Sequence, residues 1–203
     1  EEVMQHFSER LAAGEIRAAF DSARPSHVWY QRGRERLQEY RAIAAAGGWP
    51  ILPDGPTLKP GMSDTRVPVL RKRLEVTRDL VQAPGATATT DPNLYDAPLE
   101  QAVRAFQERH GLTPDAAIGP GTRAAMNVPV AQRIDQIRVN LERGRWTLHE
   151  IKGEFVLVDV AGFYVSYFRN DEPIWTSKVV VGRDERETPI FRSKITYVVF
   201  NPT

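Results

Sequence analysis

Apolar residues recur at helical spacing from residue 99 to residue 126, and this pattern predicts a small helical module. The first apolar stripe lies at i, i+3, i+4 and i+7 and consists of Leu99, Ala102, Val103 and Phe106. Pro98 suits the first turn of this helix, and Gly111 is expected to form its left-handed C-terminal cap. A second, short helix is expected to open at Gly119 and to stop at Asn127.

Helical periodicity continues on both sides of this stretch. Upstream stripes are formed by Val3, Met4, Phe7 and Leu11, by Leu37, Tyr40, Ile43 and Ala44, and by Val67, Leu70 and Leu74. A downstream stripe is formed by Ile134, Ile137 and Leu141. We expect the helix over 130–145 to pack on the N-terminal helices, so that the module is inserted into a helical scaffold. The proline-rich residues 49–56 are expected to be a rigid connector, and 81–97 a mobile surface loop.

After Trp146 the pattern changes from helical to alternating, with β-branched and aromatic residues. Strands are expected over Phe155–Val160, Phe163–Phe168, Ile174–Val181 and Ile195–Phe200, with a hairpin turn at 170–173. The fold class is therefore α+β: a helical scaffold with an inserted three-helix module, followed by the first antiparallel strands of a β-rich domain. The expected boundaries are 1–56 and 129–146 for the scaffold, 57–128 for the module and 147–203 for the β domain.

Composition narrows the candidate chemistry. The 203 residues carry a net charge of +1 and no cysteine, so we expect no nucleic-acid partner and no thiol site. No apolar run is long enough for a membrane span.

The four histidines, His6, His27, His110 and His149, form no HExxH pattern, so we expect neither a metal site nor a cofactor. The basic run 71–73 is expected to lie on a solvated helix face. The tryptophans, Trp29, Trp49, Trp146 and Trp175, are expected in core or junction packing.

The stretch AVRAFQERHGLTPDAAIGPGTRAAMN resembles the second half of a three-helix bacterial peptidoglycan-binding domain. Matching positions are Ala102, Val103, Phe106, Gln107, Gly111, Leu112, Asp115, Gly119 and Thr122. Ala116 departs from the pattern, because that family usually has glycine there. If this position needs a positive φ, alanine strains the turn.

The resemblance implies peptidoglycan, through its stem peptide or its glycan, as the partner. We expect a wall ligand to meet the edge formed by Gln107, His110, Asp115, Gly119 and Thr122. This edge combines polar side chains with the amides of a helix start and with glycines that permit close approach. Structural roles compete with binding at two of these positions, and binding is weakly indicated at a third. His110 suits a helix C-terminus, Thr122 suits a helix cap, and Gln107 is only a weak candidate for a contact.

The C-terminal stretch GFYVSYFRNDEPIWTSKVVVGRDERETPIFRSKITYVVFNPT is similar to the opening of an L,D-transpeptidase catalytic domain of the multi-domain Gram-negative type. The similarity is carried by 181–183, by Thr188-Pro189 and by the strand that ends at 199–202. It implies a location in the periplasm or cell envelope. In that family a cysteine attacks a tetrapeptide stem to form a thioester, and a neighbouring stem amine resolves the thioester into a cross-link.

The resemblance further implies that the catalytic cysteine and histidine lie beyond these 203 residues, so we expect no catalytic residue and no transpeptidase activity in this chain alone. The expected function is wall recognition and scaffolding for a peptidoglycan cross-linking L,D-transpeptidase. Two alternatives remain. The chain could belong to a non-enzymatic peptidoglycan-binding envelope protein, or the helical module could position the catalytic sheet without binding the wall.

Overall fold

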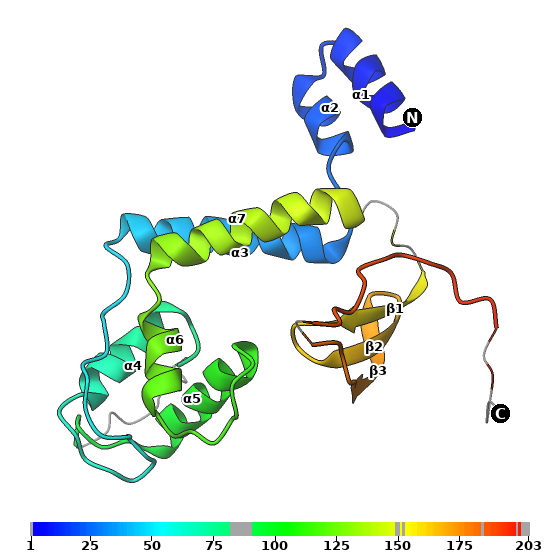
Figure 1. Ribbon diagram of the computed structural model, residues 1–203. Coiled ribbons are helices and arrows are strands. Elements are labelled where there is room, and N and C mark those ends of the chain that lie inside the picture. Colours follow the sequence, from blue (N-terminus) through cyan, green and yellow to red (C-terminus); the bar gives the residue numbers. More distant parts are fainter. Residues whose placement is uncertain are drawn as a thin grey trace. The chain divides into compact units, whose positions relative to one another are not determined.

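The computed structural model describes residues 2–81, 91–148, 151, 153–183, 185–197 and 199, with the backbone only for residues 2 and 3. The chain divides into two compact units, Glu1–Ile151 and Lys152–Thr203 (Figure 1). The first unit is helical and the second contains the sheet. Within the described residues, no helix is both long and apolar enough to cross a membrane.

The first two helices, α1 (Glu2–Ala12) and α2 (Ile16–Ser22), form a hairpin at the N-terminus. Gly14 turns the chain between them with a φ of 74°. The rings of Phe7 and Phe20 meet edge to face at 5.5 Å. The pattern predicts only α1. Met4 and Leu11, which the pattern places on the buried face of α1, are exposed.

Two long helices, α3 (Val28–Ala45) and α7 (Val130–Thr147), lie side by side although some 85 residues separate them. They run antiparallel, because Tyr30 near the start of α3 contacts Gly144 near the end of α7, whereas Gly48 lies beside Val130. Glycines permit the close approach: a Cβ on Gly33 would come within 2.9 Å of Leu141. The predicted contact of the 130–145 helix with an N-terminal helix is thus present, with α3 as the partner.

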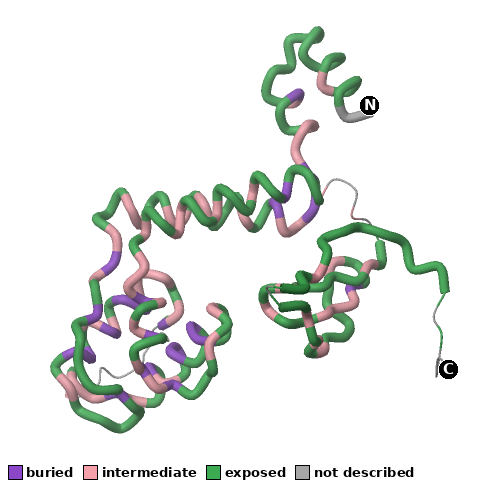
Figure 2. Tube along the Cα trace, viewed as in Figure 1, coloured by how far each residue is buried: buried purple, intermediate pink, exposed green. Residues whose placement is uncertain are grey.

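A compact three-helix module follows α3 and precedes α7. Its helices are α4 (Val67–Val76), α5 (Ala97–Arg109) and α6 (Pro120–Asn127). Most of the buried residues of the first unit lie here (Figure 2). The core comprises Leu52, Leu58, Val67, Leu70, Leu74, Leu80, Tyr95, Leu99, Ala102, Val103, Phe106, Ala116, Ile118 and Met126. The apolar stripes predicted for α4 and α5 therefore form one core.

Local sequence explains where the helices of the module begin and end. Asp96 caps α5, its carboxylate accepting a hydrogen bond from the Leu99 amide at 3.1 Å. At the other end, Gly111 has a φ of 66°. The Leu112 amide donates to the Gln107 carbonyl and the Gly111 amide to the Glu108 carbonyl, which together form a Schellman motif. The predicted glycine cap is confirmed.

The segments around the helices are tied to the same core. The Asn127 side chain pairs with the backbone of Leu52 in the proline-rich connector, at 2.8 and 2.9 Å. Most of the loop predicted over 81–97 falls on 82–90, outside the described residues. Its end is core rather than surface, because Tyr95 is buried.

An ion pair at the start of α4 makes the stability of the module depend on pH. The Asp64 carboxylate accepts three hydrogen bonds of 2.9 Å from Arg66, two from the guanidinium and one from the backbone amide. These bonds, with the side-chain bonds first in importance, lower the pKa of Asp64 from an ordinary 3.8 to about 2. The stabilisation is therefore complete above pH 4 and is lost as the pH falls from about 4 to about 2.

We expect Asp64→Asn to lower the free energy of unfolding by about 1–2 kcal/mol at pH 6, and this deficit to shrink toward zero as the pH approaches 2. Urea titrations followed by circular dichroism at pH 6, 4, 3 and 2 would measure both proteins. A deficit that stays constant across this range would contradict the assignment of the pKa shift to the folded state.

The second unit contains an antiparallel sheet of three strands, β1 (Glu154–Asp159), β2 (Tyr164–Arg169) and β3 (Glu172–Lys178), in the order β1-β2-β3. Asn170 and Asp171 join β2 to β3 with φ values of 52° and 63°, as a two-residue type I′ hairpin requires. The rings of Phe155 and Phe168 stack at 4.9 Å across the paired strands β1 and β2. The first three predicted strands are confirmed, with ends shifted by a few residues.

The fourth predicted strand, Ile195–Phe200, is wrong for its described residues. Residues 195–197 and 199 form no strand, and Ile195, Tyr197 and Val199 are exposed. The alternation of side chains is compatible with a strand, but a strand also needs a neighbour to pair its backbone amides and carbonyls. Among the described residues, none supplies that pairing to this segment.

Candidate functional site

The side chain of Gln107 holds the loop between α5 and α6 from the inside. Gln107 is only 1% exposed. Its Oε1 accepts a hydrogen bond from the Ala116 amide at 2.8 Å. Its Nε2 lies 2.9 Å from Asp115 Oδ1, 3.1 Å from the Ala117 carbonyl and 3.2 Å from Thr122 Oγ1. A buried amide thus replaces the backbone pairing that the irregular loop lacks.

Ala116, at the centre of this loop, adopts the left-handed backbone conformation with a φ of 61°. Its side chain is fully buried, and its carbonyl accepts a 2.7 Å hydrogen bond from the Tyr95 hydroxyl. Burial raises the pKa of Tyr95, so the hydroxyl stays protonated and keeps donating. The position therefore does require a positive φ, and alanine there carries the strain that glycine would avoid.

Asp115 presents its carboxylate on the outside of the same loop. The side chain is exposed, and its Oδ1 accepts hydrogen bonds from the Ala117 amide at 2.8 Å and from Gln107. These two bonds, the backbone one first, lower the pKa of Asp115. The loop thus displays a fixed anionic group that can accept hydrogen bonds from sugar hydroxyls or from peptide amines.

Gly119 and Thr122 form the start of α6 next to this carboxylate. Gly119 is the N-cap residue, and Thr122 is buried. The expectation that Thr122 caps the helix is wrong, because its hydroxyl lies three residues inside the helix and bonds to the Ala117 carbonyl at 3.3 Å. The structure therefore links Gln107, Asp115 and Thr122 in one hydrogen-bonded group, with Gly119 beside it.

His110 lies in a different environment. Its ring stacks on Phe106 with 3.9 Å between the ring centroids, and its Nδ1 is 2.8 Å from the Phe106 carbonyl. Burial, more than any neighbouring charge, lowers the pKa of His110. The geometry favours the structural interpretation of this histidine, at the C-cap position of α5. Its contact with a wall ligand stays a prediction, as it does for the other four residues.

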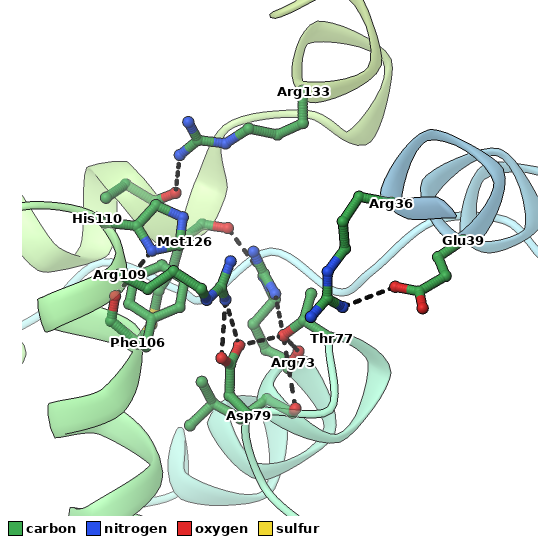
Figure 3. A network of polar contacts seen from close by, with 12 residues as sticks. Arg36, Glu39, Arg73, Thr77, Asp79, Phe106, Arg109, His110, Met126 and Arg133 are labelled. Carbon is green, nitrogen blue, oxygen red and sulfur yellow. Dashed lines mark hydrogen bonds and ion pairs between the residues drawn. The ribbon is translucent and has the colours of Figure 1, made fainter. Parts of the chain in front are cut away.

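The sequence-based prediction does not include a polar network that lies next to Phe106 (Figure 3). Asp79 accepts two hydrogen bonds from Arg109, at 2.7 and 2.8 Å, and one from Thr77 at 2.6 Å. Arg73 donates to Thr77 at 3.1 Å and to the Met126 carbonyl at 2.9 Å. The network joins the end of α4 to the ends of α5 and α6.

Arg73 corrects the prediction that residues 71–73 form a solvated face. It is 2% exposed, and its guanidinium lies 4.1 Å from the centre of the Trp49 ring. Burial lowers the pKa of Arg73 to about 10, which leaves it charged at neutral pH. Charge runs signal solvation on average. Here Arg73 points inward, because its guanidinium contacts the Trp49 ring and donates a hydrogen bond to the Met126 carbonyl near the end of α6.

The tryptophans divide between packing and exposure. Trp49 is buried, between Arg73 and an edge contact with Tyr40 at 5.8 Å. Trp29 contacts His27 edge to face. Trp146 is 81% exposed and Trp175 is 55% exposed, so the expectation of core or junction packing is wrong for these two within the described residues.

Comparison with protein families gives matches to two segments of the chain. Residues 67–126, which span α4 to α6, match the family model of a peptidoglycan binding domain. Residues 153–203, in the unit that contains the sheet, match the family model of the L,D-transpeptidase catalytic domain. No curated protein gives a significant match to the chain. The two matches together support an L,D-transpeptidase-family protein with a peptidoglycan-binding domain.

Proposed function

We propose that the α5–α6 loop of the module holds peptidoglycan for an L,D-transpeptidase that cross-links stem peptides in the periplasm. The observation that supports this proposal is the structure of the loop. Both polar atoms of the Gln107 side chain form hydrogen bonds inside the protein, and these bonds hold the exposed Asp115 at a fixed position. Such pre-organisation reduces the entropy that binding would otherwise cost. Gln107 and Thr122 support the site from within, whereas the exposed Asp115 and the half-buried Gly119 are the candidates for contact.

The transferase activity proposed for the whole protein needs a thiolate nucleophile and a base. The 203 residues contain no cysteine, so we assign them recognition and scaffolding and no catalytic step. Peptidoglycan as the partner supports a location in the cell envelope. Cross-linking of the wall would give it a role in wall biogenesis and cell shape.

The proposal predicts that Asp115→Asn weakens binding to purified, insoluble peptidoglycan by about tenfold, which corresponds to about 1.4 kcal/mol. Asparagine keeps the Oδ1 acceptor for the Ala117 amide and for Gln107, so the loop is retained while its charge is lost. Co-sedimentation at increasing peptidoglycan concentration measures the affinity, and thermal melting checks the fold.

Glu35→Gln is the matched control. Glu35 is an exposed acid on α3, outside the module, and its neutralisation should leave sedimentation unchanged. Wild-type protein that stays in the supernatant would refute peptidoglycan binding. Equal binding by wild type and Asp115→Asn would refute the loop as the binding site.

A further inference from the structure

A groove of about 690 Å³ runs along the seam between α3 and α7, apart from the α5–α6 loop. Its lining includes Tyr30, Arg34 and Arg41 of α3 and Arg138, Val139 and Arg145 of α7. A second hollow of about 380 Å³ shares Arg24 and Arg34 with it. Apolar side chains contribute to the lining, and Val139 is 51% exposed there. The groove is therefore both accessible and partly apolar.

Positive charge is concentrated in this groove. Five arginines line it against two acids, Asp135 and Glu142, whereas the whole chain carries a net charge of only +1. Both acids are already engaged, Asp135 with Arg138 at 3.0 Å and Glu142 with Arg145 at 3.5 Å. For Arg34 and Arg41, the described residues supply no carboxylate within ion-pair distance. Two guanidinium groups are thus left for an external anion.

The arginines are arranged in two facing rows. Arg34 and Arg41 are seven residues apart on α3, and Arg138 and Arg145 are seven residues apart on α7, so each row spans two helical turns, or about 10 Å. Arg145 is held in place, because its Nε donates to the Tyr30 hydroxyl at 3.1 Å. The planar guanidinium fork matches a carboxylate with two parallel hydrogen bonds. The groove fits an extended ligand that carries several carboxylates and some apolar surface.

We propose that this groove binds the carboxylates of peptidoglycan stem peptides and forms a second contact with the wall besides the α5–α6 loop. The choice of ligand rests on the proposed function, which makes peptidoglycan the partner. Stem peptides combine several carboxylates with the methyl groups of alanine, which matches the mixed lining. Two weak contacts on one chain raise the overall affinity for a polymeric wall, because the second contact forms at high effective concentration.

The test compares two double variants of the full chain that lose the same charge. Arg34→Gln with Arg41→Gln removes the unpaired groove arginines. Arg32→Gln with Arg143→Gln is the control, because both residues are exposed on the same two helices and neither lines the groove. Each protein is titrated with the soluble stem tetrapeptide and with the same peptide amidated at its carboxylates, at 50 and 200 mM salt.

The groove variant is expected to bind the tetrapeptide at least tenfold more weakly than wild type, and the control within twofold of it. Amidation should weaken wild-type binding to the level of the groove variant, and higher salt should reduce the wild-type affinity most. Equal loss in both double variants would overturn the proposal, because net charge alone would then explain binding. Equal binding of the amidated peptide would overturn it as well.

Two further measurements separate this proposal from the proposed function and from a membrane partner. One outcome refutes the groove proposal and leaves the proposed function intact. In that outcome, intact peptidoglycan sediments the wild type and Asp115→Asn weakens this binding, whereas the groove variant binds the tetrapeptide as tightly as the wild type does. If neither form of peptidoglycan binds the wild type, both proposals fail. Vesicles containing anionic phospholipid are the remaining probe, and capture that depends on Arg34 and Arg41 without tetrapeptide binding would assign the groove to a lipid surface instead.

Discussion

Phe106→Ala is expected to lower the free energy of unfolding of the helical unit by about 3–5 kcal/mol. The Phe106 ring is fully buried in the core of the module and stacks on His110. The guanidinium groups of Arg73 and Arg109 lie 5.7 and 5.6 Å from the centre of its ring. Removal of the ring leaves a cavity beside the guanidinium groups of Arg73 and Arg109. Packing contacts and cation–π contacts are therefore lost together.

Urea unfolding followed by circular dichroism at 222 nm measures this loss. Glu108→Ala is the control, because Glu108 is exposed on the same helix and its replacement should change stability by less than about 0.5 kcal/mol. A loss below about 1 kcal/mol for Phe106→Ala would mean that the module does not pack around this ring.

Gln107→Leu is expected to destabilise the same unit by about 2–4 kcal/mol, although leucine has a similar size and is more apolar. The substitution leaves the buried Ala116 amide without its acceptor and removes the donor that Asp115 and Thr122 share. Each buried polar group left unpaired costs about 1–3 kcal/mol. The strained backbone at Ala116 would lose the bond that opposes its relaxation.

Two readouts distinguish this effect from a simple loss of packing. The unfolding free energy should fall, and hydrogen exchange of the Ala116 amide should accelerate more than exchange within α5. Gln101→Leu on the exposed face of α5 is the matched control and should be close to neutral. A Gln107→Leu protein with wild-type stability and unchanged exchange at Ala116 would show that the loop does not depend on this side chain.

The elements of the chain could be predicted where the local pattern and the tertiary partner agree. The stripe from Leu99 to Phe106 predicts α5 because the same residues that repeat at helical spacing also fill the module core. The turn at Asn170 and Asp171 is predictable because these residue types tolerate a positive φ. The sequence pattern does not predict α2, because seven residues are too few to show a helical repeat of apolar positions.

The sequence predicts which residues belong to the candidate site, but not how their side chains are arranged. Gln107, Asp115 and Thr122 were named from the sequence, and the structure brings them together. Their division into buried support and exposed contact could not be predicted, because polarity alone does not show on which side of a loop a side chain lies. The positive φ at Ala116 was foreseen only through the comparison with a glycine position.

By itself, the sequence determined the local features of this protein: the helices of the module, the glycine cap after α5, the hairpin between β2 and β3, and the absence of a thiol nucleophile. Only the tertiary structure decided that Arg73 is buried, that Tyr95 holds the carbonyl of Ala116, and that Arg34 and Arg41 face α7 across one groove. The reason is physical. Caps, turns and periodic stripes depend on neighbours within a few residues. The burial of a charge or the convergence of like charges instead depends on groups brought together from distant parts of the chain.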